Sequence, residues 1–252
     1  MSHKVYFASD LHIGAPSLLE SRSREVKFVE WLEKAAEDAT EIHLLGDIFD
    51  FWFEYRRSVP KGGTRILGTI ARIIDRGIPV HYHIGNRDIW SFGYLEEECG
   101  VILHKKPQIF EWDGLKCLVA HGDGLGPGEY TYKALKKVYQ NRLCQWLFKL
   151  IHPDFGIALA NLFIKKKHFK TDGVSSGEGF ESEDNEILFA FCKDHLTKDS
   201  SIDCFIMGHR HLPLDLKINQ TNGAQSRYIN IGDWTSHFSW ACLEKGEITL
   251  YK

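Results

Sequence analysis

The 252-residue sequence predicts an α/β fold in which packed β-sheets are flanked by helices. In residues 1–120, short apolar runs of strand length alternate with segments that repeat apolar residues every three or four positions. From Asp203 to the end, strand-like runs dominate again. Alternating strands and helices are typical of α/β folds. The length suits one large domain or two small ones, and we expect a single domain over residues 1–252.

The first half is expected to contain five strands and two helices. Apolar periodicity predicts helices at 26–36 and 65–76, and Gly77 followed by Pro79 ends the second helix. The Asp113-Gly114 pair separates two strand-like runs and is a strong hairpin signal. The expected strands are 5–8, 42–45, 80–84, 109–112 and 115–120.

The end of the chain is expected to complete the sheets. A helix is predicted at 186–196, and Lys245-Gly246 is a second, weaker hairpin signal. The expected strands are 204–207, 214–218, 227–231, 238–243 and 248–251.

Between His121 and the strand at 204 the pattern is helical, with expected helices at 130–151 and 154–167. Residues 133–170 carry nine Lys or Arg and one acid, a net charge of +8, whereas the rest of the chain carries −11. Apolar residues are also frequent there, and basic with apolar side chains indicates an interfacial helix pair. We expect a helical cap inserted at about 126–185, which includes a Gly-, Ser- and acid-rich loop at 171–185.

Composition excludes several classes of protein. A net charge of −3, from 31 basic and 34 acidic residues, provides no global basic field, so nucleic-acid binding is not expected. No apolar run reaches the ~18 residues that span a bilayer, and no signal-peptide pattern is present. We therefore expect a cytosolic protein or one attached to a membrane surface. The six cysteines lie far apart and are expected to be buried reduced thiols.

Five short polar segments follow predicted strands. Asp10 and His12 are two apart, so both side chains can reach one ion from the same side of an extended chain. The same spacing recurs at His209 and His211, and Asp47 has two oxygens with which to bridge two cations. Two divalent ions ~3.5 to 4 Å apart hydrolyse phosphate esters. The segments are Asp10-Leu-His12, Gly46-Asp47, Gly85-Asn86-Arg87-Asp88, His121-Gly122-Asp123 and Gly208-His209-Arg210-His211.

Each segment alone would more often be an ordinary turn or surface histidine. All five segments, however, directly follow predicted strands, and open α/β sheets bind ligands at the carboxyl ends of strands. This shared position favours a common binding site over five unrelated turns. Histidine, Asp and Asn without thiolates favour Mn, Mg, Fe or Zn in an open site over structural zinc. The other histidines lack such neighbours and are assigned no metal role: His3, His43, His81, His83, His104, His152, His168, His195 and His237.

Together the five segments resemble the calcineurin-like metallophosphoesterase superfamily, and the match spans residues 10–211. The resemblance implies a metallophosphoesterase fold, with two packed mixed β-sheets flanked by helices in the order α-β-β-α. It implies that two divalent ions share Asp47 and activate the attacking water. The first ion is implied to be bound by Asp10, His12, Asp47 and His211. The second is implied to be bound by Asp47, Asn86, His121 and His209.

One segment departs from the general pattern. The superfamily has Gly-Asn-His-Asp, and in this chain Arg87 takes the place of the histidine. Arginine is no useful proton donor at neutral pH, but its planar guanidinium suits phosphate oxygens. The Gly-Asn-Arg-Asp form resembles the UDP-2,3-diacylglucosamine diphosphatases of lipid A synthesis. Residues 46–52, the His121-Gly-Asp123 step, the helical insertion and Trp234 resemble that family too.

In that family the insertion is a cap that holds two acyl chains above the metals. The resemblance implies attack of water on the α phosphorus of UDP-2,3-diacylglucosamine, giving UMP and 2,3-diacylglucosamine 1-phosphate. Mn²⁺ is the expected metal, with Mg, Fe or Zn as alternatives. The expected location is the cytoplasmic face of the inner membrane of a Gram-negative bacterium. Arg87 and Asp88 are the expected catalytic residues. The expected substrate contacts are Asn86, Arg87, Glu129, Tyr132, Lys165, Lys166 and Lys167.

Two alternatives remain open at this point. A phosphoesterase for another nucleotide or phosphodiester would use the same ions, and rapid hydrolysis of soluble diesters would favour it. A non-catalytic scaffold is disfavoured because the chain keeps every expected ligand. For the cap, the plainer interpretation is that its apolar faces bury against each other and its lysines are merely solvated.

Overall fold

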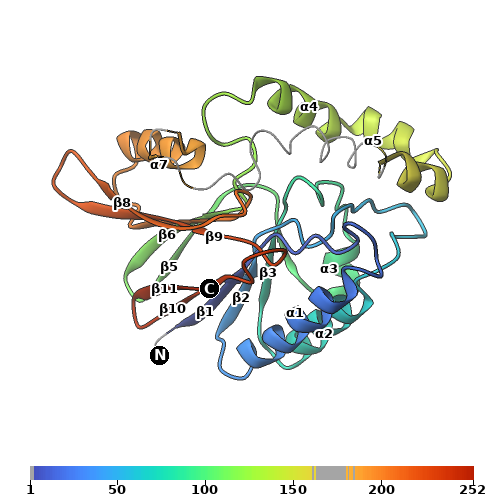
Figure 1. Cartoon of the computed structure of the whole chain (residues 1–252), viewed down its shortest axis with the longest axis horizontal. Coiled ribbons are helices and arrows are strands. Elements are labelled where there is room, and N and C mark those ends of the chain that lie inside the picture. Colours follow the sequence, from blue (N-terminus) through green and yellow to red (C-terminus); the bar gives the residue numbers. More distant parts are fainter. Residues whose placement is uncertain (1–2, 161, 163–179, 181, 184) are drawn as a thin grey trace.

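The computed structural model describes residues 3–160, 162, 180, 182, 183 and 185–252. The expected Lys165, Lys166 and Lys167 contacts, and most of the 171–185 loop, lie outside the described residues. Two mixed sheets form the centre of the molecule (Figure 1). This arrangement confirms the predicted α/β class.

The first sheet has six strands in the order β11-β10-β1-β2-β3-β4. β1, β2, β3 and β4 run parallel, and β10 pairs antiparallel with both β1 and β11. Successive side chains of a strand point to opposite faces, so the consecutive buried residues of β1, β2 and β10 pack on both faces of the sheet. The strands are β1 (Lys4–Ala8), β2 (Glu41–Leu44), β3 (Val80–His83), β4 (Ile102–His104), β10 (Trp240–Glu244) and β11 (Glu247–Tyr251).

The second sheet has five strands in the order β5-β6-β7-β9-β8. The Asp113-Gly114 turn joins β5 to β6 as predicted, and β6, β7 and β9 run parallel. The strands are β5 (Gln108–Trp112), β6 (Leu115–Ala120), β7 (Cys204–Met207), β8 (Pro213–Asn219) and β9 (Gln225–Ile231).

Helices cover the outer faces of both sheets, so the layers run α-β-β-α as expected (Figure 1). Between the sheets, buried side chains such as Phe7, Val119 and Ile206 form one core. α1 (Arg22–Ala35), α2 (Thr64–Asp75) and α3 (Tyr94–Cys99) pack on the first sheet. α7 (Ile187–Lys198) packs on the second.

The cap differs from the sequence prediction at one point. The single helix expected at 130–151 is two helices, α4 (Tyr130–Gln140) and α5 (Arg142–Lys149). Asn141 separates them in an extended conformation, and its side-chain oxygen accepts hydrogen bonds from the backbone N–H groups of Leu143 and Cys144. This is an N-cap, and asparagine is among the residues that best fill that position.

The apolar side chains of the cap are largely exposed. No residue of α4 or α5 is buried, and Leu143, Trp146 and Leu150 keep 62%, 55% and 65% of their surface accessible. In the part of the chain that the structure describes, the cap helices therefore do not bury their apolar faces against each other. Among these residues, no helix is both long and apolar enough to span a bilayer.

Candidate metal centre

The loop that follows β1 places Asp10 and His12 under backbone strain. Both residues have positive φ angles, 55° and 46°. Their N–H groups donate to the carbonyls of Gly46 and Asp47, which ties this loop to the one after β2. Asp47, His209 and His211 also have positive φ angles. Side chains other than glycine adopt this region at a cost, and such strain tends to cluster at functional sites.

One group of possible ligand atoms joins Asp10, His12 and His211. Oδ1 of Asp10 lies 3.6 Å from Nε2 of His12 and 3.3 Å from Nε2 of His211. Ligand bonds of about 2.0 to 2.2 Å place neighbouring donors at such separations around one ion. The three side chains therefore fit a shared cation.

A second group joins Asp10, Asp47 and His121. Nε2 of His121 lies 3.6 Å from Oδ1 of Asp47 and 3.4 Å from Oδ1 of Asn86. The His209 ring stands 5.0 Å from the His121 ring, measured between centroids. The other oxygen of Asp47, Oδ2, lies 3.8 Å from Nε2 of His12. Asp47 thus faces both groups, as a bridging carboxylate would.

Two atoms at the centre lack a hydrogen-bond partner among the described residues. They are Oδ1 of Asp10 and Nε2 of His12, and both are buried. A buried polar atom without a partner costs free energy, so its presence calls for a physical explanation. Cations placed between these donors would satisfy both atoms, so the residues present fit a pair of divalent ions.

The other ring nitrogen of three histidines is held by an acceptor. Nδ1–H of His12 donates to Asp50 at 3.2 Å, and that of His211 donates to Asp233 at 3.1 Å. In His121, Nδ1–H donates to the backbone carbonyl of Leu45 at 2.6 Å. Such bonds fix the tautomer and leave Nε2 as the free ligand atom. The sequence prediction missed these two carboxylates, because they are distant in the chain: Asp50 lies 38 positions from His12, and Asp233 lies 22 positions from His211.

Glycines let the strand ends approach closely. A Cβ atom on Gly85 would lie 2.2 Å from Oδ1 of Asp47, and one on Gly208 would lie 2.7 Å from Oδ2 of Asp10. Neither distance is possible without moving the carboxylate. Arg24 of α1 also fixes the loop, because its guanidinium donates to the carbonyls of Leu11 and His12. These contacts position the predicted ligands.

Burial and neighbouring histidines shift the pKa values of Asp10 and His209 in the centre. Burial opposes the ionisation of Asp10, but His211 and His12 hold the pKa of its carboxyl well below the usual value. Burial lowers the pKa of His209 to about 3, and the nearby His121 adds to this shift. His209 is therefore a neutral imidazole, which is the form that binds metals.

Asp88 lies behind the centre and not within it. Its carboxylate is fully buried and accepts hydrogen bonds from the backbone of Gly85 at 2.6 Å and of Ile48 at 3.3 Å, and from the Tyr82 hydroxyl at 2.6 Å. Burial and the neighbouring Asp47 raise the pKa of Asp88 to about 7. These contacts tie the Asp88 carboxylate to the start of the turn that carries Asn86 and Arg87.

Arg87 lies at the rim. Its backbone N–H donates to Oδ1 of Asp47 at 2.8 Å, and its Nε lies 4.0 Å from Asp50. The turn that positions the Arg87 guanidinium therefore also contacts the Asp47 carboxylate, through the Arg87 backbone N–H. Of the expected cap contacts, Tyr132 donates its hydroxyl to Asp123, and Glu129 is half-buried just before α4.

A third cluster of possible ligands lies between the sheets, at Glu41, His43 and His81. The His43 and His81 rings are stacked at 4.4 Å with their planes 2° apart. Lone pairs in parallel planes cannot converge on one ion. Both rings instead have Nε2 near Oε2 of Glu41, at 3.4 Å and 3.2 Å. We therefore interpret the cluster as a hydrogen-bonded network.

Comparison with known proteins gives relatives along the whole chain. The chain is 34% identical over 264 aligned positions to a UDP-2,3-diacylglucosamine hydrolase of Porphyromonas gingivalis, which covers 99% of this chain and 97% of that protein. It is 25% identical to the enzyme of the same name from Tolumonas auensis, over 97% of this chain and 94% of that protein. A predicted phosphoesterase from Streptococcus pneumoniae TIGR4 has a similar solved structure, with a TM-score of 0.41 and 11% identity, covering 96% of this chain and 82% of that one. No protein-family profile matches the chain.

The α-β-β-α layers and the His/Asp clusters at the strand ends define a metallophosphoesterase, a metal-dependent hydrolase. Within that class, the chain belongs to the UDP-2,3-diacylglucosamine hydrolase family.

Proposed function

We propose that this protein hydrolyses the pyrophosphate of UDP-2,3-diacylglucosamine, giving UMP and 2,3-diacylglucosamine 1-phosphate. The observation that carries the proposal is the similarity over 99% of the chain to a UDP-2,3-diacylglucosamine hydrolase, because it includes the cap as well as the strand ends. A diacyl sugar needs apolar surface, and each buried methylene contributes about 0.8 kcal/mol. The exposed apolar residues of α4 and α5 supply such surface next to the centre.

The first ion would be held by Asp10, His12, Asp47 and His211, and the second by Asp47, Asn86, His121 and His209. When bound, the two ions would supply Lewis-acid neutralisation of phosphoryl oxygens and activation of a water molecule. Oxygen and imidazole donors without thiolate suit Mn²⁺, which we propose as the metal.

The chain's own residues would orient the substrate. The Arg87 guanidinium at the rim can bind two phosphoryl oxygens at once and neutralise charge that develops on them. Asp88 would hold the Gly85–Arg87 turn through its bonds to Gly85 and Tyr82. Asp50 and Asp233 would keep the Nε2 atoms of His12 and His211 unprotonated.

We further propose that the protein works in the cytoplasm, at the inner membrane of a Gram-negative bacterium. The exposed apolar cap, which also carries basic side chains, suits contact with a lipid surface. Vesicle flotation tests this part: replacing Trp146 and Leu150 by Ser should release the protein from anionic vesicles, and unchanged flotation would contradict it.

The test of the reaction is incubation of the purified protein with Mn²⁺ and UDP-2,3-diacylglucosamine in ¹⁸O-labelled water. Attack on the α phosphorus places the label in UMP, and mass spectrometry reads its position. Label in the lipid phosphate would mean attack on the other phosphorus. Absence of cleavage, together with rapid hydrolysis of a small diester, would assign another substrate. Asp47→Ala should abolish turnover, whereas Asp215→Ala, at an exposed ion pair, should not.

A further inference from the structure

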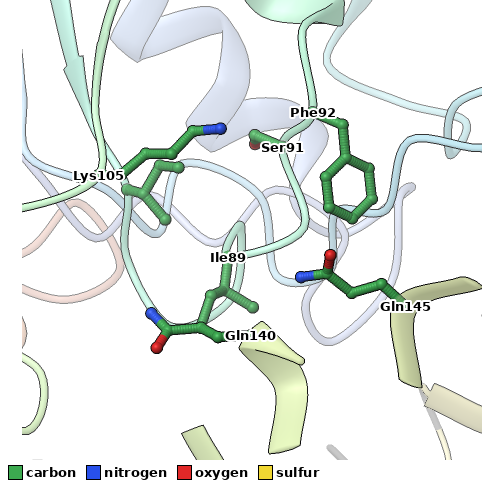
Figure 2. Close-up of a pocket in the computed structure, with 7 residues that line it drawn as sticks. Ile89, Ser91, Phe92, Lys105, Gln140 and Gln145 are labelled. Atoms are coloured by element: carbon green, nitrogen blue, oxygen red, sulfur yellow. The ribbon is translucent and has the colours of Figure 1, made fainter. Parts of the chain in front are cut away.

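Two hollows adjoin beside the metal centre. The larger, of about 250 Å³, lies between the segment after β3 and two cap residues, Gln140 at the end of α4 and Gln145 within α5 (Figure 2). The smaller, of about 40 Å³, is bordered by His121 and Asp123 of the strand-end loop after β6. Both include Ile84 and Lys105 in their walls. The two hollows therefore adjoin along these shared residues, and together they are named here the Lys105 groove; one end lies at His121, a predicted metal ligand.

The end of the groove nearest His121 is cationic. Lys105, Lys106 and Lys136 all contribute to its wall. Lys136 is paired with Asp123 at 2.6 Å, whereas Lys105 and Lys106 have no ion-pair partner among the described residues. Ammonium groups beside a phosphoryl-transfer centre attract the phosphate of a substrate or product. This end of the groove suits a phosphate that remains after the bond is cleaved.

The far end of the groove has a different lining. Figure 2 shows Gln140 and Gln145 facing Ile89 and Phe92 across the cavity. Gln145 donates one N–H to the Tyr139 carbonyl at 2.9 Å, which orients its carboxamide and leaves its oxygen available. Carboxamides offer both donors and acceptors. The Lys149 ammonium lies over the Phe92 ring, 4.1 Å from its centroid, and the ring also borders the cavity, where it offers an aromatic surface on which a base can stack. This combination recognises a planar heterocycle with carbonyl groups, such as a pyrimidine base.

An acyl chain fits this cavity poorly. Lys105, Gln140 and Gln145 place ammonium and carboxamide groups in its wall. Apolar methylenes packed there would deprive those groups of water without replacing their hydrogen bonds, which is unfavourable. A volume of about 250 Å³ is below the ~300 to 1,000 Å³ of pockets for larger ligands, so it suits part of a substrate.

We infer that the Lys105 groove holds the nucleotide half of the substrate, with its phosphate at Lys105 and Lys106 and its uracil against Phe92 between Gln140 and Gln145. This inference rests on the proposed function, since it takes the substrate to be a pyrimidine nucleotide. It assigns specificity to residues outside the metal centre, and Phe92 and Gln145 discriminate the base.

The test measures binding of UMP and of inorganic phosphate to the full-length, Mn²⁺-loaded protein by calorimetry. Phe92→Ala removes the stacking face and should weaken UMP about tenfold while leaving phosphate unchanged, given the usual strength of base stacking. Gln145→Leu should weaken UMP severalfold, again without affecting phosphate. Lys106→Glu should weaken both ligands. Lys137→Glu, an equal charge reversal on the same helix as Lys136 but away from the groove, should weaken neither.

Parallel assays separate this inference from the proposed reaction. If the wild type releases UMP from the UDP-lipid but Phe92→Ala and Gln145→Leu bind UMP like the wild type, the groove assignment is overturned and the reaction stands. If the UDP-lipid is not cleaved, the reaction fails, and the groove is judged by UMP binding alone. Phe92→Leu keeps the volume if the alanine variant does not fold. Hydrolysis of a small diester should be unchanged in the Lys137→Glu control.

Discussion

Asp233→Asn should weaken metal binding through the tautomer of His211. In the structure, Nδ1–H of His211 donates to Oδ2 of Asp233 at 3.1 Å, and Nε2 faces Asp10 at 3.3 Å. Asparagine places an NH₂ group where that acceptor was. The ring must then accept at Nδ1 and carry its proton on Nε2, which removes the lone pair that would bind the ion.

The amide cannot escape this conflict by rotating. The other carboxylate oxygen, Oδ1, accepts from the backbone N–H groups of Ser236 and His237, both at 2.9 Å. A flipped amide would point its NH₂ at two donors. Loss of such a supporting partner costs about 10- to 100-fold in metal affinity, which corresponds to roughly 1.4 to 2.7 kcal/mol.

The assay is Mn²⁺ affinity by chelator competition, together with turnover at saturating metal. Asp215→Asn is the matched control, because Asp215 pairs with Arg227 on an exposed strand and touches no histidine. Exposed ion pairs contribute about 0 to 1 kcal/mol to stability, so the control should bind Mn²⁺ normally. Equal affinity in the wild type and Asp233→Asn would refute the tautomer argument.

Three further changes test other parts of the account. Arg87→Lys keeps the charge but loses the planar fork, so turnover should fall at least tenfold with metal content unchanged; unaltered turnover would remove Arg87 from the mechanism. Gly85→Ala should displace Asp47 and lose bound metal, read by elemental analysis, whereas Gly68→Ala, with nothing within 4 Å, should not. Burial lowers the pKa of His43 to about 4, below the unfolded ~6.5, so the unfolded chain binds more protons between these pH values and stability falls as the pH drops. Between pH 7.5 and 5, the unfolding free energy of His43→Gln should therefore fall by about 2 kcal/mol less than that of the wild type. An equal fall in both proteins would contradict this argument.

Much of the fold could be predicted because the spacing of apolar residues and the residue types at turns depend only on neighbouring positions in the sequence. β6 and the Asp113-Gly114 hairpin appear where a short apolar run and a two-residue turn predict them. α3 and β4 were missed, since Tyr94–Cys99 is a short acidic segment and Ile102–His104 spans only three residues. Neither is long enough to show a period. The break at Asn141 was also missed, because apolar spacing continues through it and only the cap geometry ends α4.

The metal-ligand residues of the centre could be predicted because they directly follow predicted strands. Asp10 and Asp47 follow the parallel strands β1 and β2 of the first sheet, and His121 follows β6 of the second; the structure brings these strand ends together, as their positions after strands predicted. Their partners could not be found this way. Asp233 meets His211 only because β9 lies beside β7 in the second sheet, and pairing between strands is set by tertiary packing.

The most direct test of the central claim is anomalous diffraction at the manganese edge from crystals grown with Mn²⁺. The account predicts two peaks about 3.5 to 4 Å apart, with the Asp47 carboxylate between them. One peak should contact His12 and His211 and the other His121 and His209. Manganese bound elsewhere, for example at Glu41, His43 and His81, with no peak near Asp47, would contradict it.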